Sequence, residues 1–145
     1  MPPRGDNMIL GIGIDIVEVS RVEALLEKWG EGFLERIFLP EEIAYCQKKK
    51  YPAQHYAARI AVKEAVMKAF GEGWTEKIGW KDILINRARK GRPGVELLGK
   101  GEKLREEMNV ESVLVSLSHA DSYSVAQAII TGIPNQKSQI SNKSQ

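Results

Sequence analysis

ARIAVKEAVMKAFG, residues 58–71, is rich in strong helix formers and ends at a glycine, a common helix stop. We therefore predict a helix over about Ala53–Phe70. On this helix Glu64 and Lys68 lie one turn apart on the same stripe. That stripe also carries three apolar residues, Ala57, Ile60 and Ala61. One interpretation is an ion pair between Glu64 and Lys68 on a solvated face. The other follows from the apolar stripe, which places both charges against the core, where a buried carboxylate needs a cationic partner or a metal ion.

Composition limits the class of protein. The chain has 145 residues, of which 43% are hydrophobic and 28% charged, as expected for one globular domain. A net charge of +2 is far from the bias of a dedicated nucleic-acid binder. The single cysteine, Cys46, excludes a disulfide within the chain, and two histidines leave little room for a histidine-rich metal cage.

The sequence predicts one domain between two flexible ends. We expect the domain over residues 8–131, with polar ends at 1–7 and 135–145. Apolar runs are too short for a membrane span, and the sequence shows no signal-peptide core, so a cytoplasmic location is expected.

Both helix and strand patterns occur within this domain. Ser20-Arg21-Val22-Glu23 has the spacing of a capping box and predicts a helix that ends at Gly30. Other expected elements are helices at Pro40–Lys50 and Gly101–Met108, and strands at Ile9–Val17, Ile83–Asn86, Val95–Leu98, Val113–Ser118 and Ser124–Ile130. This order favours an α+β fold with antiparallel pairing.

Asp15 is an unusual residue for the first strand. It shares a face with Gly11 and Gly13, whose missing side chains allow a ligand or a backbone to approach closely. Asp15 alternatively ends the strand and caps the next turn. A dinucleotide-binding fingerprint is absent, because its third glycine falls at Ile16.

One strand carboxylate and one helix carboxylate are enough to hold Mg²⁺, with water and substrate phosphates as the other ligands. Asp15 and Glu64 are therefore candidate metal ligands. Lys68 is placed to neutralise charge on a phosphate or a leaving group. Arg59 and Lys63 form a second basic pair on another stripe of the same helix.

The segment Ser116-Leu117-Ser118-His119 supplies a third candidate. A histidine at a strand end beside hydroxyl groups can bind phosphate or carry a proton, or it can be a hydrogen-bonded structural residue. A basic run at Arg87, Arg89, Lys90 and Arg92 is either a partner surface or a solvated hairpin.

Three motifs together resemble the holo-acyl-carrier-protein synthase family. They are Gly11–Glu18 with Arg21 behind it, Arg59–Gly71 with its Lys63-Glu64-Ala65 core, and Ser116–His119. Their order and the overall length fit the short, trimeric branch of the 4′-phosphopantetheinyl transferase superfamily. The resemblance implies an antiparallel sheet with a long helix packed on it. It also implies transfer of 4′-phosphopantetheine from coenzyme A to a serine of an apo acyl carrier protein, with release of adenosine 3′,5′-bisphosphate.

The resemblance assigns roles residue by residue. Asp15 and Glu64 match Mg²⁺ ligands, and Lys68 matches a lysine at the coenzyme A phosphates or the leaving group. His119 matches a histidine at the coenzyme 3′-phosphate, and Arg21 matches an arginine that meets the acidic carrier.

Further residues are expected in the coenzyme site. Arg59 matches an arginine near the coenzyme or the carrier, and we expect Lys63 and Ser118 to contact the coenzyme. Val17 stands where larger relatives place a third carboxylate, so water is expected there. Ala120 follows His119 where an acid is common, and Arg92 stands where lysine is frequent.

The resemblance also implies a cyclic trimer, with the coenzyme cleft between neighbouring subunits. The general base stays open between Glu64 and a water at the metal, and the carrier stays open between fatty-acid, polyketide and other types. Two alternative functions remain at this point. One is a small basic module that binds an acidic protein or RNA, and the other is a different Mg²⁺-dependent phosphoryl-transfer enzyme.

Overall fold

The computed structural model describes residues 6–71, 76–87 and 91–134. Its elements in chain order are β1 (Met8–Glu18), α1 (Val19–Trp29), α2 (Glu31–Ile37), α3 (Pro40–Gln47), α4 (Pro52–Phe70), η1 (Trp80–Asp82), β2 (Ile83–Arg87), β3 (Pro93–Leu97), α5 (Lys100–Glu107), β4 (Val110–His119) and β5 (Tyr123–Gly132). The α+β class is confirmed. Predictions for residues 1–5 and 135–145, and for Arg89 and Lys90, lie outside the described residues.

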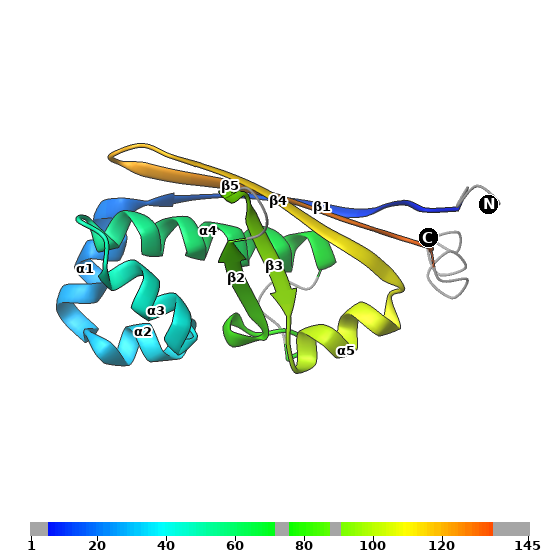
Figure 1. Ribbon diagram of the computed structural model, residues 1–145, viewed down its shortest axis with the longest axis horizontal. Coiled ribbons are helices and arrows are strands. Elements are labelled where there is room, and N and C mark those ends of the chain that lie inside the picture. The colour runs from blue at the N-terminus through cyan, green and yellow to red at the C-terminus, as the bar shows by residue number, and fades with distance from the viewer. Residues whose placement is uncertain (1–5, 72–75, 88–90, 135–145) are drawn as a thin grey trace.

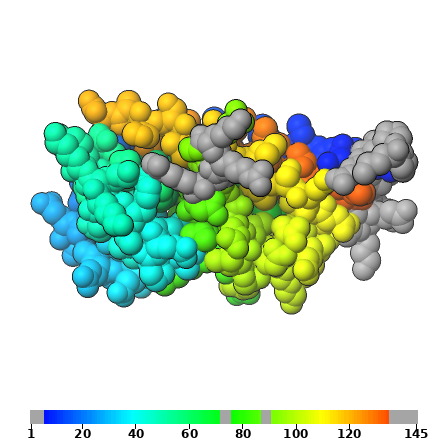
Figure 2. Space-filling model, in the orientation of Figure 1, coloured from blue at the N-terminus to red at the C-terminus, as the bar shows by residue number. Residues whose placement is uncertain are grey.

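The fold is layered around α4. A three-stranded antiparallel sheet of order β1-β5-β4 lies on one side of this helix (Figure 1). On the other side, α1–α3 cover one part of α4, while the two-stranded hairpin β2-β3 and α5 lie beside them (Figure 1). In the space-filling view, α1–α3 form one end of the molecule, and β3 and α5 lie toward the other end (Figure 2).

Helix α4 is close to its predicted length. Tyr51 is the residue before the helix, Pro52 begins it, and Gly71 ends it with a left-handed φ of 79°. Most of its side chains are buried, so it is a central helix rather than an amphipathic surface helix. From Tyr56 to the end of the helix, two side chains escape this burial: Glu64 is half-buried and Lys68 is exposed.

The glycines of β1 admit the backbone of α4. A Cβ atom at Gly11 would overlap the carbonyl oxygen of Ala69, and one at Gly13 would overlap that of Ala65. The glycine face of β1 therefore contacts helix backbone, and it holds Asp15 against the same helix. This close approach is one of the two alternatives that the sequence left open.

The other face of the sheet is uncovered in a single chain. Its isoleucine side chains on β1, Ile12, Ile14 and Ile16, have exposed fractions of 59%, 62% and 62%. Leu114 on β4 is likewise exposed. These four residues are called the outer sheet face below.

The helices differ from the sequence predictions in three details. Helix α1 begins at Val19, and the Ser20 hydroxyl donates to the carboxylate of Glu18, so no capping box forms at Ser20. Helix α2 was not predicted, because Gly30 and Gly32 lower its local propensity, and burial of Leu34 and Ile37 compensates. Helix α3 ends at Gln47 rather than Lys50.

Candidate active site

Strand β1 and helix α4 bring Asp15 and Lys68 together. The Lys68 ammonium donates to Oδ1 of Asp15 at 2.9 Å and to the carbonyl oxygen of Ile14 at 3.1 Å. The Asp15 side chain is only 10% exposed, whereas that of Lys68 is 51% exposed. The second carboxylate oxygen of Asp15, Oδ2, is buried and accepts no hydrogen bond from the described residues.

Glu64 faces Asp15 from the preceding turn of α4. The pKa of Glu64 is raised to about 7, first by burial and then by a hydrogen bond to Asp15 and by the negative charge of Asp15. The positive charges of Lys68 and Arg21 act in the opposite direction. Two carboxylates that share one site in this way cannot both ionise easily without a cation.

This pair suits a hard divalent cation. Mg²⁺ is commonly held by one or two carboxylates, with water and substrate phosphates as its remaining ligands. The unpartnered Oδ2 of Asp15 is an oxygen available for such an ion. Among the described residues, no cluster of three or more His, Cys, Asp or Glu side chains is placed to bind a metal, so a two-carboxylate site is the candidate.

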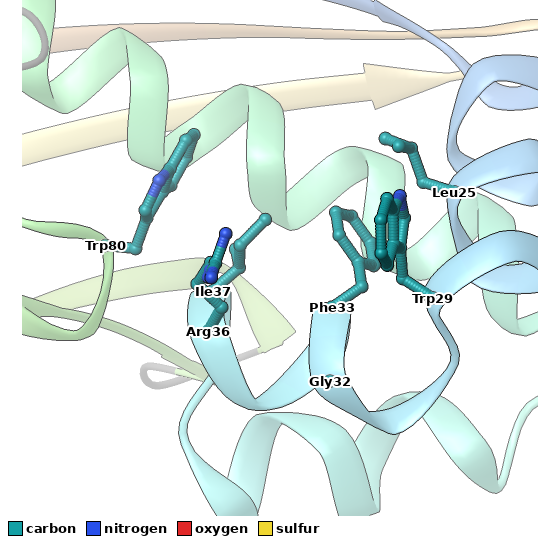
Figure 3. Close-up of a pocket in the computed structure, with 7 residues that line it drawn as sticks. All are labelled: Leu25, Trp29, Gly32, Phe33, Arg36, Ile37 and Trp80. Carbon is teal, nitrogen blue, oxygen red and sulfur yellow. The ribbon is translucent and has the colours of Figure 1, made fainter.

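A groove leads away from Glu64 between α1 and α2. Its inner part is a cavity of about 260 Å³ that Glu64 and Arg21 help to line. Its outer part is a cavity of about 520 Å³ lined by Leu25, Trp29, Gly32, Phe33, Arg36, Ile37 and Trp80. Four residues line both parts: Leu25, Phe33, Ile37 and Trp80. Trp80 lies at one end of the outer part and Trp29 at the other, with Arg36 and Ile37 between them (Figure 3). We call the two parts together the α1–α2 groove.

A second polar site forms at the start of α4. The Arg59 guanidinium lies 4.2 Å from the ring centre of Tyr45, and its Nη1 donates to the carbonyl oxygen of His55. The rings of His55 and His119 are 5.8 Å apart. Arg59 Nε is buried without a hydrogen-bond partner among the described residues. These four residues, Tyr45, His55, Arg59 and His119, are called the basic–aromatic cluster.

Arg59 and His119 are thus brought near each other, but Glu64 is not part of their cluster. His55 and Glu64 are separated by nine positions of α4, which is roughly 14 Å of helix. Ser118 lies on the opposite side of β4 from its neighbour His119, since strand side chains alternate, and it is exposed. The two serines and His119 therefore do not form one group within a single chain.

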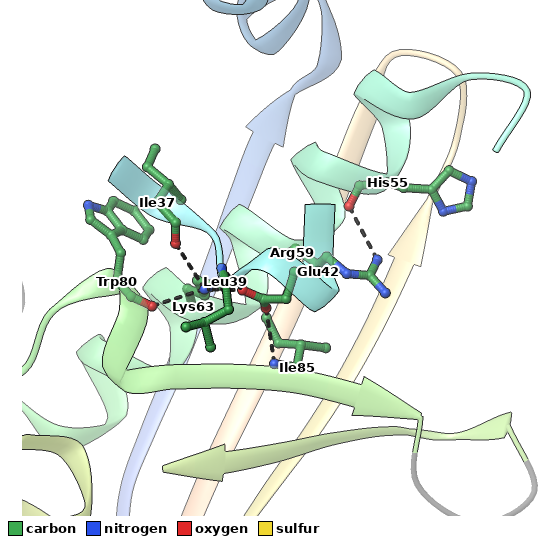
Figure 4. Close-up of polar contacts among 8 residues, drawn as sticks. All are labelled: Ile37, Leu39, Glu42, His55, Arg59, Lys63, Trp80 and Ile85. Carbon is green, nitrogen blue, oxygen red and sulfur yellow. Dashed lines mark hydrogen bonds and ion pairs between the residues drawn. The ribbon is translucent and has the colours of Figure 1, made fainter. Parts of the chain in front are cut away.

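Lys63 has a structural environment that the sequence did not indicate. Its side chain is 0% exposed, and its ammonium donates to the Ile37 carbonyl, the Trp80 carbonyl and Glu42 (Figure 4). Burial lowers the pKa of Lys63, and the ion pair with Glu42 opposes this shift. All three ammonium hydrogens are used, so Lys63 has no donor for the coenzyme contact that we expected.

Sequence reasoning missed three residues of these sites. His55 shares a stripe with Arg59 at a spacing of four residues, which is a signal that could have grouped them. Tyr45 and Glu42 lie on α3, and only the packing of α3 against α4 shows what they contact.

Known protein sequences include clear matches to this chain. The family model described as the 4′-phosphopantetheinyl transferase superfamily (ACPS) matches residues 11–128. A holo-[acyl-carrier-protein] synthase of Syntrophus aciditrophicus is 43% identical over 126 residues, which cover 87% of this chain and 98% of that protein. One of Geobacter sp. strain M21 is 40% identical over 85% of this chain and 98% of its own.

Solved structures give the same picture. The holo-[acyl-carrier-protein] synthase of Neisseria meningitidis matches with a TM-score of 0.80 and 32% identity, covering 85% of this chain and 98% of its own. The Helicobacter pylori enzyme, solved in complex with coenzyme A, matches with a TM-score of 0.74 and 31% identity over 82% of this chain and 98% of its own. Within the described residues, no helix combines the length and apolarity needed to span a bilayer.

Proposed function

The chain belongs to the 4′-phosphopantetheinyl transferase superfamily, among its holo-[acyl-carrier-protein] synthases, and from that premise we propose a Mg²⁺-dependent reaction at Asp15 and Glu64. In this reaction, phosphopantetheine passes from coenzyme A to a serine of an apo acyl carrier protein. The observation that carries the proposal is the pair of apposed carboxylates with Lys68 beside them. A pyrophosphate is the kind of substrate whose charge such a site can balance.

The transfer forms one bond to phosphorus and breaks another. The carrier serine Oγ forms a bond to the phosphorus that bears the pantetheine. The bond from that phosphorus to the bridging pyrophosphate oxygen breaks, and adenosine 3′,5′-bisphosphate leaves with the electron pair. The serine proton passes to a base, for which Glu64 and a water in the same site are the two candidates.

Each side chain has a task in this scheme. Asp15 and Glu64 would hold Mg²⁺, which when bound neutralises the pyrophosphate and orients it for in-line displacement. Lys68, whose exposed ammonium already lies beside Asp15, places positive charge where the leaving oxygen develops negative charge.

The basic–aromatic cluster is proposed as the site for the adenosine 3′-phosphate. Arg59 and His119 offer donors beside two aromatic rings, and Arg59 Nε is buried and unused by the described residues. Ser118 lies on the opposite side of β4 from His119, so it is proposed to contact the coenzyme only across a subunit interface. Along α4, Glu64 lies five positions, about 7.5 Å, from Arg59 and nine positions, about 14 Å, from His55. The coenzyme cleft is proposed to be shared with a neighbouring subunit.

A homotrimer is the proposed assembly. The outer sheet face exposes a row of isoleucines that a monomer in water does not normally leave uncovered, and a second copy of the chain is the occupant we propose for it. Cyclic contacts of this kind repeat one head-to-tail interface around a ring.

The α1–α2 groove is the proposed docking surface for the carrier. Its inner part reaches Glu64, and most of its lining residues are apolar. Arg21 at its inner part and Arg36 at its outer part are exposed and positively charged, which complements an acidic carrier. Arg21 is thus placed between the carrier surface and the metal pair.

Incubation of an apo carrier protein with coenzyme A and Mg²⁺ tests the function. Mass spectrometry should show the carrier heavier by one phosphopantetheine, and chromatography should show adenosine 3′,5′-bisphosphate. A carrier whose acceptor serine is alanine, and a reaction with excess chelator, are the controls. A phosphatase would release inorganic phosphate, whereas a binding module would retain the carrier unchanged. The same assay should compare carriers of fatty-acid synthesis with carriers of polyketide synthesis.

A cytoplasmic location is part of the proposal. The free, buried thiol of Cys46 suits a reducing compartment.

A further inference from the structure

Lys63 and Glu42 form a buried polar network at the centre of the helical half. Lys63 donates to Glu42 Oε1 at 2.7 Å, to the Trp80 carbonyl at 2.9 Å and to the Ile37 carbonyl at 3.0 Å. Glu42 also accepts hydrogen bonds from the backbone N–H groups of Leu39 and Ile85 (Figure 4). Both side chains are fully buried, and both use their hydrogen-bonding capacity on protein groups.

The network joins segments that are distant in sequence. Ile37 ends α2, Glu42 lies in the first turn of α3, Trp80 begins η1, and Ile85 lies on β2. All of these segments are connected to α4 through the single ammonium of Lys63. Desolvating two charges is costly, and a buried ion pair is weak support for stability by itself. The residues to which this ion pair is bonded therefore indicate its role better than its contribution to stability does.

Two of the residues that Lys63 holds are walls of the α1–α2 groove. Ile37 and Trp80 line both the inner and the outer cavity, and the carbonyl oxygen of each is bonded to Lys63. The next residue of α4, Glu64, lies at the inner end of the same groove. One side chain thus fixes the separation of two groove walls and ties them to the helix that carries Glu64.

We propose that the Lys63–Glu42 pair is a positioning device that sets the shape of the α1–α2 groove for the carrier protein. The proposal rests on the proposed transferase function and extends it to residues that touch neither the metal pair nor the coenzyme. Since neither side chain reaches the groove itself, both act only through Ile37 and Trp80.

The test compares Glu42→Gln with a remote variant of similar stability. Glu42→Gln keeps the side-chain volume but removes the charge and cannot accept the Ile85 N–H with its amide nitrogen. The expected result is a lower Tm and a KM for the carrier raised by about fivefold or more, with kcat within about threefold and coenzyme A affinity within about twofold. Leu104→Ala on α5, which is buried away from the groove, should lower Tm without changing the carrier KM.

Several outcomes would overturn the proposal. One is a folded Glu42→Gln variant with a carrier KM within about twofold of the wild-type value, and another is an equal rise in Leu104→Ala. If Glu42→Gln does not fold, Lys63→Arg, which keeps the charge but lengthens the side chain, is measured in the same way. Failure of both to fold would show that the pair serves the fold alone. An inactive wild-type protein would refute the proposed function and this role with it, whereas an active wild type with unaffected variants would refute only this role.

Discussion

The Lys68 ammonium lies 2.9 Å from Oδ1 of Asp15, although 53 residues separate the two in sequence. The contact fixes the last turns of α4 on β1. It occupies one oxygen of Asp15. The other oxygen, Oδ2, is buried and has no hydrogen-bond donor in the described part of the chain, and the same carboxylate interacts with Glu64. The Lys68 ammonium therefore balances one of the two negative charges that Asp15 and Glu64 carry when both are ionised. The second negative charge is available for a metal ion.

Removal of either carboxylate should abolish transfer. Asp15→Ala and Glu64→Ala each remove one of the two proposed Mg²⁺ ligands, so kcat/KM is expected to fall by at least about 100-fold at moderate Mg²⁺. Both chains should remain folded by circular dichroism, because the buried apolar core around α4, to which neither carboxylate belongs, holds most of the fold. Near-normal turnover of either variant would show that the two residues do not share one metal ion.

The raised pKa of Glu64 predicts a specific dependence of stability on pH. Glu64 titrates at about 7 in the metal-free protein and near 4.5 when unfolded, so the native state binds more protons between these values. The free energy of unfolding should therefore fall as pH rises from about 4.5 to about 7, through this group. Urea titrations of the wild type at several pH values measure the effect.

Glu64→Gln is the control for that dependence, since it should flatten the curve over the same interval. Mg²⁺ competes with the proton, so calorimetry should show weaker Mg²⁺ binding below about pH 7 and proton release on binding. Identical pH curves for the wild type and Glu64→Gln would mean that Glu64 is not the group that titrates.

Charge reversal at the groove should affect the carrier and spare the coenzyme. Arg21→Glu is expected to raise the carrier KM by about tenfold or more, because it places a negative charge where an acidic partner approaches. The wild-type association rate should fall with added salt, as charges are screened beyond about 8 Å at physiological ionic strength. Lys103→Glu, an exposed reversal on α5, is the matched control and should leave the carrier KM unchanged. A loss of coenzyme A affinity in Arg21→Glu would instead place Arg21 in the nucleotide site.

The contact between β1 and α4 predicts a sharp difference between two glycines. Gly13→Ala should lower the free energy of unfolding by about 1–3 kcal/mol or more, since the added methyl group would overlap the carbonyl of Ala65. Gly32→Ala on α2 meets nothing within 4 Å, and it should stabilise the chain slightly, by less than about 1 kcal/mol. Urea denaturation of both variants checks this. A Gly13→Ala protein as stable as the wild type would contradict the close approach.

Much of the architecture follows from local sequence signals. Pro52, Gly71 and the helix formers between them specify where α4 begins and ends. Strand alternation specifies the faces of β4. Helix α2 escaped prediction, because its stability comes from burial of Leu34 and Ile37 against distant segments.

Some residues of the candidate sites are also visible in the sequence, and others depend on tertiary packing. Motif residues such as Asp15 and Glu64 are visible as acids in apolar surroundings, and their roles as metal ligands remain predictions. The partner of Lys63 could not be found, since a charge at a helical spacing looks the same whether it faces water or a buried carboxylate 21 residues away. Tertiary packing of α3 decides that question.

Assembly provides the last prediction. Ile14→Glu places a charge in the middle of the outer sheet face, where the side chain is 62% exposed in one chain, so the chain should fold but sediment as a monomer with little activity. If the coenzyme cleft joins Glu64 of one subunit to His119 of the next, inactive Glu64→Ala and His119→Ala chains, mixed and reassembled, should regain part of the wild-type activity. Head-to-tail interfaces in mixed rings must include some that contain both intact residues. Verified mixed trimers without recovered activity, or a wild type that is active as a monomer, would mean that one chain builds the whole site.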